Sequence, residues 1–358
     1  MTRIVHVDPH HPNPSVIADA AAVWRRGGLV AFPTETVYGL GANALDAAAV
    51  ARIFEAKGRP STDPMIVHIA DARDLRTVAV DVPALAMACA AAFWPGALTL
   101  ILQRHRDVPA SVSAGLSTIG VRVPSHPVAQ ALLQRAGLPI AAPSANRFSR
   151  PSPTCAEHVR VDLDGVIDVI VDAGSTTIGV ESTILDLTVT PAVIRRPGGI
   201  PLDAIQRIVP EVRMSHQSVD IAQPQPSPGQ LLRHYAPRAR LTLYLGSVDA
   251  VAHRLAADAR SQAASGSRVG VLAPAEDLLA LAPRLAAAAG GGRIMTRRYG
   301  SRADHDEAAR ELFAALRELD GEAVDVILAA GTGHAGIGAA IVDRLTRAAE
   351  GRVILANG

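Results

Sequence analysis

The sequence predicts an α/β protein of two domains, and three observations support this. Along the first two hundred residues, apolar runs typical of strands alternate with helical patterns, as in a sheet covered by helices. A stretch rich in proline and glutamine interrupts the pattern, and a second alternating series follows it. A length of 358 residues exceeds one typical domain and suits two, each with its own apolar core.

Five apolar runs are expected to form strands of the first domain: residues 29–32, 65–69, 119–123, 166–172 and 181–187. The uncharged stretch 82–102 approaches the length of a membrane span. Pro83 can begin a helix there, however, and Pro95-Gly96 ends it before a short apolar run. We therefore expect a buried helix, a turn and a strand, and no membrane span.

The second domain is expected to be a small parallel sheet of Rossmann type, with right-handed crossover connections. Its predicted strands, 241–245, 269–273 and 324–329, alternate with alanine-rich helices near 248–264, 275–289 and 304–319. Residues 331–336 match GxGxxG, but weakly, and we favour a tight turn over a dinucleotide site. The predicted limits are 1–212 for the first domain, 213–237 for the linker and 238–358 for the second domain.

Composition excludes several functional classes. The 35 basic and 34 acidic residues give a formal net charge of +1, so no field over the whole surface favours nucleic acid or membrane. Cys89 and Cys155 lack CxxC spacing and predict neither a disulfide framework nor a cysteine-rich zinc site. The first residues lack a basic region followed by an apolar core. We expect a cytoplasmic protein with no resident metal and no membrane partner.

Lys57 is the only lysine of the chain. Its compact ammonium on a flexible stem suits contact with phosphate oxygens, whereas a guanidinium is a planar fork. Position 57 is therefore a candidate phosphate contact. The alternative is structural: Lys57 ends a helix that begins near Asp46, with Gly58 just beyond it, where a cation is favourable for the helix dipole.

Several loops that follow predicted strands are rich in polar residues, and ligands gather at such loops in α/β sheets. Residues 33–41 combine hydroxyl groups, a carboxylate and glycines that permit close backbone approach. Ser144 and Asn146 follow the apolar run 139–142, and Ser152 comes soon after. These side chains are neutral hydrogen-bonding groups suited to a phosphate or a ribose. Taken singly, each loop is also compatible with an ordinary capped turn.

Two charged or titratable residues lie within predicted strands. Arg122 is flanked by apolar residues, where an unpaired charge is costly, so it requires an anionic partner. That partner is either a ligand or a structural carboxylate. His68 also has apolar neighbours, and it is either a hydrogen-bonded core residue or a ligand contact.

Together, the ordered motifs at 33–41, 57–60, 144–146, 179–183 and 196–198 closely resemble those of the YrdC-type threonylcarbamoyl-AMP synthases. The segment from Ser227 to Pro237 is similar to the one that marks their long two-domain form. The resemblance covers essentially the whole chain. It implies a YrdC-like twisted mixed sheet with flanking helices, joined by a proline-rich linker to the Rossmann-like domain. It also implies that the linker closes on the active site.

The resemblance implies a nucleotidyltransferase that converts L-threonine, bicarbonate or carbon dioxide, and ATP into threonylcarbamoyl-AMP and pyrophosphate. Mg²⁺ would accompany ATP. A separate transferase complex would then carry the threonylcarbamoyl group to an adenosine beside the tRNA anticodon, so tRNA is an indirect partner. A carbamate that attacks the α-phosphorus needs orientation and charge stabilisation, and it needs no Ser-His-Asp triad.

By similarity, the L-threonine site would contain Thr36, His68, Arg122, Ala142 and Ser182. The implied ATP contacts are Arg59, Asp63, Thr118, Ser144, Ser152, Arg196 and one residue of the pair His234 and Tyr235. Lys57 and Arg59 are the candidate catalytic residues, with Lys57 included on the charge argument above.

Two positions depart from the family pattern. Gln230-Leu231-Leu232 stands where related sequences often have Met-Lys-Tyr, which leaves out a cationic contribution from the linker. Asp63 stands where many relatives have asparagine, and an added carboxylate would repel a triphosphate unless Mg²⁺ intervened.

Two other functions are alternatives to the synthase. A YrdC-like module could hold structured RNA without performing chemistry, and its affinity would then fall steeply with salt. A carbamoyltransferase of hydrogenase maturation contains a related domain, but that family carries cysteine-rich zinc fingers, which two isolated cysteines cannot supply.

Overall fold

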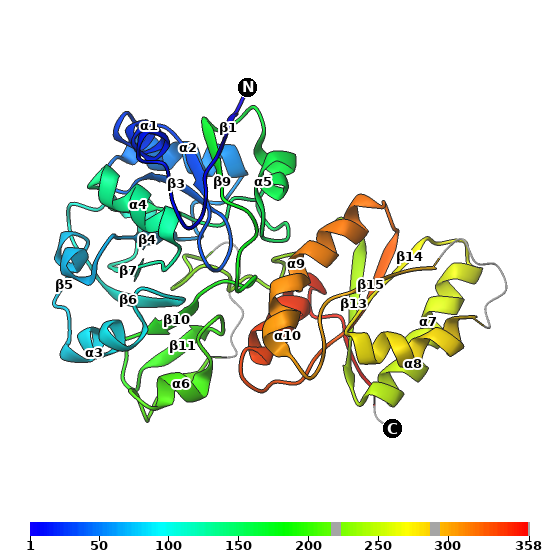
Figure 1. The fold of residues 1–358 in the computed structure, drawn as a ribbon. Coiled ribbons are helices and arrows are strands. Elements are labelled where there is room, and N and C mark those ends of the chain that lie inside the picture. The colour runs from blue at the N-terminus through cyan, green and yellow to red at the C-terminus, as the bar shows by residue number, and fades with distance from the viewer. Residues whose placement is uncertain (216–222, 287–293, 357–358) are drawn as a thin grey trace. The chain divides into compact units, whose positions relative to one another are not determined.

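The computed structural model describes residues 1–215, 223–286 and 294–356, and it divides the chain into two compact units (Figure 1). The first unit comprises Met1–Phe148 and Ser152–Leu231. The second comprises Ser149–Pro151 and Leu232–Gly358. Each unit has its own sheet and core, and each is described by itself.

The first unit is built on a mixed sheet, which contains twelve strands among the described residues. Its order is β1-β9-β2-β3-β8-β4-β7-β6-β10-β11-β12, with β5 paired to β6. The strands are β1 Arg3–His6, β2 Val30–Phe32, β3 Gly39–Asn43, β4 Ile66–His68, β5 Ala79–Val80, β6 Leu98–Arg104, β7 Thr118–Arg122, β8 Ile140–Ala141, β9 Val169–Asp172, β10 Thr183–Asp186, β11 Val193–Arg196 and β12 Arg213–Met214.

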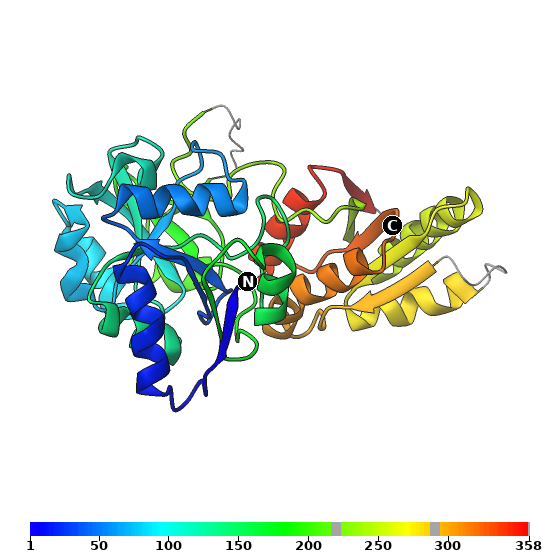
Figure 2. The same ribbon diagram turned by 90° about the horizontal axis from the view of Figure 1, so that it is seen from above.

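Helices cover both faces of this sheet, and the predicted α/β class with a mixed sheet is confirmed. They are α1 Pro14–Arg25, α2 Ala47–Lys57, α3 Ala84–Phe93, α4 Pro127–Ala136, α5 Ala156–Leu163 and α6 Leu202–Gln206, with 3₁₀ turns at Ala72–Thr77 and Ala110–Ser113. Two apolar clusters fill the space between helices and sheet. Val30 and Phe32 pack with α1 and α4, whereas Ala31 packs with α2 and α5. This alternation follows from the two-residue period of a strand, and Figure 2 shows α1 and α2 on opposite sides of the sheet.

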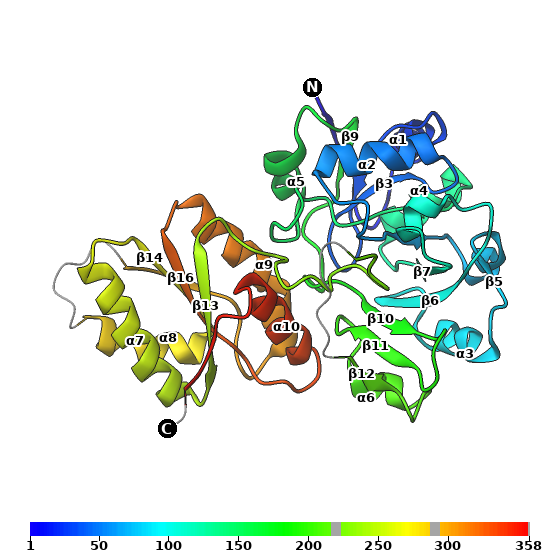
Figure 3. The same ribbon diagram turned by 180° about the vertical axis from the view of Figure 1, so that it is seen from behind.

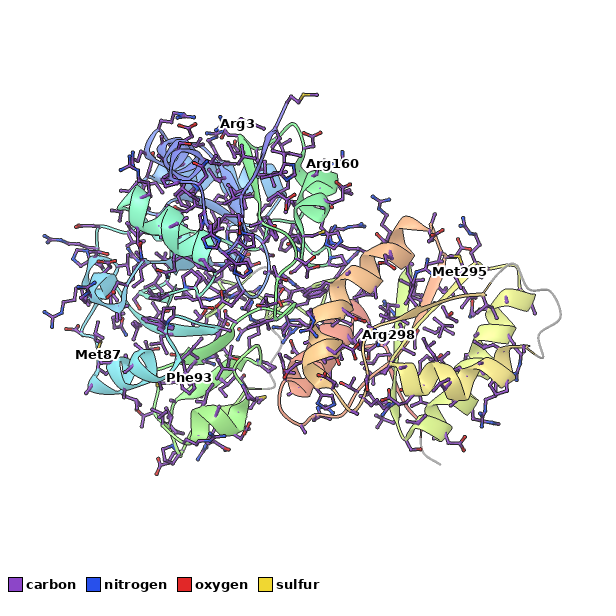
Figure 4. All side chains as sticks on the ribbon, in the orientation of Figure 1. Arg3, Met87, Phe93, Arg160, Met295 and Arg298 are labelled. Carbon is purple, nitrogen blue, oxygen red and sulfur yellow. The ribbon has the colours of Figure 1, made fainter. Side chains whose placement is uncertain are left out.

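The uncharged stretch 82–102 forms a helix, a turn and a strand, as predicted. Pro83 precedes α3, and β6 begins after Pro95-Gly96. The helix is not wholly buried, however, because Leu85 and Met87 are exposed on it. Figure 4 labels Met87 and Phe93 near the two ends of α3.

None of the helices in the described ranges combines the length and the apolar character that crossing a membrane requires.

The second unit contains a five-stranded parallel sheet in the order β15-β14-β16-β13-β17. Its elements are β13 Arg240–Gly246, α7 Val248–Ala264, β14 Val269–Ala273, α8 Ala275–Ala286, β15 Ile294–Arg298, α9 His305–Gly321, β16 Val326–Ala330, α10 Gly338–Ala348 and β17 Val353–Ala356. Helices α7 and α8 lie on one face and α9 and α10 on the other (Figures 1 and 3). The predicted Rossmann-like parallel sheet is confirmed, whereas the prediction lacked β15 and β17. Residues 287–289 of the predicted second helix lie outside the described residues.

The glycine-rich segment after β16 forms a tight connection to α10. This agrees with the tight turn that the sequence favours over a dinucleotide site. A Cβ atom added to Gly338 would lie 2.2 Å from the carbonyl oxygen of Gly333. Gly336 has a φ of 57°, in the left-handed region that favours glycine. Backbone packing therefore accounts for these glycines.

The predicted linker begins with a strand. Arg213–Met214 form β12 and pair in parallel with β11. Residues 216–222 of the linker lie outside the described residues, and 223–231 belong to the first unit. There the backbone N–H of Gln225 donates to the carbonyl oxygen of Thr62 at 3.0 Å. The predicted domain limits themselves stay predictions.

Candidate active site

Arg122 ends strand β7 and finds its anionic partner in Glu35. The guanidinium Nη2 lies 2.8 Å from Glu35 Oε1, and both side chains are buried. Nη1 donates to Thr36 Oγ1 at 2.9 Å, and Nε donates to the Gly96 carbonyl at 3.1 Å. Burial alone would raise the pKa of Glu35, but the charge and hydrogen bond of Arg122 outweigh burial and lower it. A structural carboxylate therefore holds Arg122, with two of its five N–H donors left by these contacts.

His68 lies beside Arg122, because β4 and β7 are parallel and the two residues are register partners. Burial, reinforced by the nearby Arg122 charge, lowers the pKa of His68 to about 3. The imidazole is therefore neutral at physiological pH. Its Nδ1 atom is buried and has no hydrogen-bond partner among the described residues. Such an atom suits a ligand hydroxyl group.

Ala142 directly follows strand β8, and Ser182 lies just before the start of another strand. The Ala142 amide donates to Ile66 at 2.9 Å, which places Ala142 beside the strand that carries His68. Ser182 directly precedes β10, and its Oγ lies 2.8 Å from Thr99 Oγ1 on β6. Arg122 thus hydrogen-bonds to Thr36 and lies opposite His68 in the neighbouring strand, and Ala142 lies beside the strand of His68.

Lys57 is the last residue of α2, whose first turn is capped by Asp46. Gly58 follows with a φ of 63°, as expected for a glycine at a helix end. The predicted helix end is confirmed. The ammonium does more than complement the helix dipole, because it donates to the carbonyl oxygens of Ser144 (2.6 Å) and Asn146. Lys57 therefore fastens the end of α2 to the 144–146 loop.

Arg59 and Asp63 form a buried ion pair, with Nη2 2.9 Å from Oδ1. The guanidinium also donates to the carbonyl oxygens of Asp63 and Pro64 at 3.1 and 2.6 Å. Burial raises the pKa of Asp63, and the charges of Arg59, Lys57 and Arg196 act in the opposite direction. Asp63 is thus the shared counter-charge of a cluster of three cations, which we call the cationic cluster (Lys57, Arg59, Asp63 and Arg196).

Arg196 connects the cationic cluster to Ser182. Its Nη2 donates to the Ser182 carbonyl at 2.9 Å and to Ser182 Oγ at 3.3 Å. Gly198 permits this arrangement, since a Cβ atom there would lie 2.3 Å from the Glu181 carbonyl oxygen. Glu181 in turn accepts a hydrogen bond from Ser152. The predicted ATP contacts Ser152 and Arg196 are therefore joined through residues 181–182.

Thr118 begins β7, at the opposite end of the strand from Arg122. It lines a small cavity of about 10 Å³, roughly the space for one water molecule. Pro64 and the linker residues Pro226, Ser227 and Pro228 line the same cavity. The linker thus lies on the first unit next to Pro64, at the nucleotide side of the predicted site.

His234 and Tyr235 belong to the second unit and are described with it. The ring of Tyr235 lies 5.5 Å from the ring of Phe313, and the Arg344 guanidinium carbon lies 5.1 Å from the Tyr235 centroid. The side chains of His234 and Tyr235 are both buried. Contact of this pair with ATP stays a prediction.

Comparison with known proteins decides the family. A family model described as "Telomere recombination" (Sua5/YciO/YrdC) matches residues 22–198, and a model of the "Threonylcarbamoyl-AMP synthase, C-terminal domain" matches residues 200–350. The threonylcarbamoyl-AMP synthase of Bacillus subtilis is 45% identical, with 96% of this chain and 95% of that protein aligned. The enzyme of Pyrococcus abyssi is 43% identical, with 94% of each chain aligned. This chain belongs to the threonylcarbamoyl-AMP synthases.

Solved structures agree with the family assignment. The crystal structure of P. abyssi Sua5 complexed with L-threonine superposes with a TM-score of 0.91 at 42% identity, covering 99% of this chain and all of that one. Escherichia coli YciO is 29% identical and covers 55% of this chain, with a TM-score of 0.51. The synthase fold is therefore shared in both units with Sua5 and in about half of the chain with YciO.

Sequence reasoning missed several residues that hold the synthase site together. Glu35 lies within the motif 33–41 but was not assigned to the site. Thr99 and Glu181, which hydrogen-bond to Ser182 and Ser152, were also not assigned. The cost of burying an unpaired Arg122 was the available signal for Glu35, whereas no sequence signal distinguishes Thr99 from other strand threonines.

Proposed function

We propose that the first unit binds L-threonine and ATP side by side and forms the bond between them. The chain is a threonylcarbamoyl-AMP synthase, an enzyme whose product is linked to AMP. The observation that carries the assignment of residues is the position of Ser182. Its Oγ lies 2.8 Å from Thr99 on β6, the strand that pairs with the Arg122 strand β7, and it accepts from Arg196 of the cationic cluster. Two anions held on either side of Ser182 would have their reacting atoms close together.

On the amino-acid side, Arg122 would bind the carboxylate of threonine with the N–H donors that Glu35, Thr36 and Gly96 leave. Its position at the end of a buried strand restricts the rotamers of the side chain, so little entropy is lost on binding. Neutral His68 would hydrogen-bond to the threonine hydroxyl through Nδ1. Ala142 and Ser182 would complete the pocket as small side chains.

On the nucleotide side, the cationic cluster has three positive and at most one negative charge, a balance of at least +2. That field suits the phosphates of ATP. Because Arg59 neutralises Asp63 at 2.9 Å, the extra carboxylate need not repel the nucleotide. Thr118, Ser144 and Ser152 would donate hydroxyl hydrogen bonds, and one residue of the His234-Tyr235 pair stays a predicted ATP contact.

Mg²⁺ would enter as part of the nucleotide substrate. In the described part of the chain, no group of three or more His, Cys, Asp or Glu side chains is placed to hold a metal ion. MgATP brings its own oxygen ligands, and Mg²⁺ usually binds proteins through few carboxylates and through substrate phosphates. The metal would add to the charge stabilisation that Arg59 and Arg196 supply.

The reaction needs orientation more than it needs a protein nucleophile. The threonine amine takes up carbon dioxide, loses a proton and becomes a carbamate. A carbamate oxygen then forms a bond to the α-phosphorus while the bond from that phosphorus to pyrophosphate breaks. The negative charge moves onto the departing pyrophosphate, where Lys57, Arg59 and Arg196 would stabilise it. Orientation of this kind contributes on the order of 7–11 kcal/mol in favourable cases.

Bicarbonate as the carbon source, transfer of the product to a downstream threonylcarbamoyl-transferase complex, indirect service to tRNA and a cytoplasmic location are parts of the same proposal. They are supported by the family of the chain.

The test is incubation of the full chain with ATP, Mg²⁺, bicarbonate and each of several amino acids, followed by mass detection of acyl-adenylates. We expect threonylcarbamoyl-AMP and pyrophosphate to form from L-threonine, without RNA, and only with bicarbonate present. The Arg122→Ala variant is the matched control and should give little product at the same threonine concentration. Binding of RNA with no pyrophosphate release would instead support a non-catalytic module.

A further inference from the structure

The second unit contains a polar pocket that the synthase reaction does not use. It has a volume of about 190 Å³, below the roughly 300–1,000 Å³ of sites for drug-sized ligands. Its polar lining residues are Arg240, Thr242, Tyr244, Asp258, Ser261 and Gln262. We call it the β13–α7 pocket after the two elements that carry these residues.

The local structure explains why these six side chains converge. Arg240, Thr242 and Tyr244 are alternate residues of β13 and therefore share one face of the sheet. Asp258, Ser261 and Gln262 lie on α7 at spacings of three and four residues, so they share one face of the helix. Helix α7 packs over this sheet face, and the pocket lies between the two rows.

The floor of the pocket is apolar. Val326 and Leu328 of β16 and Ile354 of β17 form it. They are the register partners of Arg240, Thr242 and Tyr244, respectively. A ligand would therefore meet an apolar surface below and polar groups along two sides, the usual composition of a small-molecule site.

One wall of the pocket is fixed by hydrogen bonds. Tyr244 Oη donates to Asp258 Oδ2 at 2.8 Å, and Arg254 Nε donates to the same oxygen at 3.0 Å. Burial, together with Asp258, raises the pKa of Tyr244, so the phenol remains a donor. The second carboxylate oxygen, Oδ1 of Asp258, makes no hydrogen bond within the described residues.

The other polar side chains of the pocket are also without internal partners. Within the described ranges, no hydrogen bond or ion pair engages the side chains of Arg240, Thr242, Ser261 or Gln262. A cation and a carboxylate oxygen thus face one pocket with bonding capacity unused. Arg254 already pairs with Oδ2 of Asp258, so the carboxylate offers Oδ1 as an acceptor and Arg240 offers donors. A molecule with one positive and one negative group would bond to both.

We propose that the β13–α7 pocket binds a small zwitterion, a free amino acid, whose carboxylate pairs with Arg240 and whose ammonium donates to Oδ1 of Asp258. Thr242, Ser261 and Gln262 would hydrogen-bond to its polar groups, and the apolar floor would contact its side chain. This site is separate from the residues proposed for threonine and ATP, and its existence does not depend on their roles.

The chain supports a direct test because it has four tyrosines, and one of them, Tyr244, lies in the pocket. The full chain would be labelled with 3-fluorotyrosine, and the Tyr244→Phe variant would assign the ¹⁹F signal of Tyr244. The probes are mixtures of the twenty protein amino acids and then each one alone, at millimolar concentration, with acetate, methylammonium and inorganic phosphate titrated separately.

We expect at least one amino acid to shift the Tyr244 signal saturably, with acetate and methylammonium much weaker. Arg240→Ala should weaken binding about tenfold or more, since a charged hydrogen bond contributes about 1.5–3 kcal/mol. Asp258→Asn tests the ammonium contact. Arg310→Ala, an exposed arginine on α9, is the matched control and should bind as the unmodified chain does. No saturable shift, a response to phosphate alone, or equal binding by Arg240→Ala would overturn the proposal.

Discussion

The Arg122 guanidinium and the Glu35 carboxylate lie 2.8 Å apart, and neither side chain is more than 8% exposed. Since the charge of Arg122 is already balanced, a threonine carboxylate would be the second anion on the same guanidinium. Glu35 therefore keeps the arginine ordered before substrate arrives and also limits how tightly a carboxylate can bind.

Replacing Glu35 with glutamine tests this relationship. Glu35→Gln leaves a buried cation unbalanced, so we expect a loss of about 3 kcal/mol in the free energy of unfolding. L-Threonine would restore the balance, and its addition should raise the Tm more for this variant than for the unmodified chain. Thermal unfolding with and without L-threonine is the measurement. Glu157→Gln, at an exposed ion pair on α5, is the control; an equal threonine effect in all three proteins would contradict the argument.

Arg122→Ala should raise the KM for L-threonine roughly 10- to 100-fold, because hydrogen bonds to a charged group are lost. The KM for ATP should stay unchanged. Pyrophosphate release at varied concentrations of each substrate measures both. Arg73→Ala removes an exposed arginine and should change neither value. Unchanged threonine saturation in Arg122→Ala would reject the assigned role.

Lys57→Ala should impair use of the nucleotide by releasing the 144–146 loop. We expect the KM for ATP to rise roughly tenfold or more, from the loss of hydrogen bonds to the Ser144 and Asn146 carbonyls. Lys57→Arg should not restore it, since a planar fork does not replace a compact ammonium in a buried site. Pyrophosphate release at saturating threonine is the assay, and an arginine variant with the original KM would show that charge alone suffices.

His68 should make the fold sensitive to acid. Its pKa is about 3 in the folded chain and about 6.5 when unfolded. Between pH 6.5 and 3 the unfolded state binds the extra proton, so stability falls as pH falls, by about 1.4 kcal/mol per pH unit. Urea unfolding at pH 7 and pH 5 should show a smaller loss for His68→Asn than for the unmodified chain. An equal loss of stability in both proteins would show that groups other than His68 cause the acid sensitivity.

The linker segment Pro226-Ser227-Pro228 should protect the product from water. Replacing these three residues with glycine would loosen the wall of the cavity next to Thr118 and admit water to the mixed anhydride. We expect AMP to accumulate at the expense of threonylcarbamoyl-AMP, as measured by mass spectrometry over time. Pro224→Gly changes an exposed neighbouring proline and should leave the ratio of AMP to threonylcarbamoyl-AMP unchanged. If the triple variant also gave the ratio of the unmodified chain, the linker segment would not protect the product.

Much of the fold and site followed from local chemistry in the sequence. The cost of burying Arg122 required an anion, and the glycine after Lys57 indicated a helix end. The identity of the anion did not follow, because Glu35 meets Arg122 only when distant strands come together. Asp63 was expected to repel phosphates, and its pairing with Arg59 was not visible from the sequence.

The missed strands have physical reasons. Strand β3 contains Gly39 and Gly41, and glycine is depleted in strands. Its place is imposed by packing, since a Cβ atom at Gly41 would lie 2.8 Å from the Trp24 ring. Strand β15 is a half-exposed edge strand with two arginines, one of which, Arg298 (Figure 4), pairs with Glu307 and Glu311. Neither strand has the apolar run by which buried strands are predicted.

The burial of Lys57, which is 3% exposed, has a practical consequence for work with this enzyme. Lys57 carries the sole ε-amino group of the chain, and that group donates hydrogen bonds to two carbonyl oxygens. Reagents that acylate accessible primary amines would therefore react at the terminal α-amino group and leave the folded interior unmodified. Coupling to an activated ester resin should immobilise every molecule through a single attachment point.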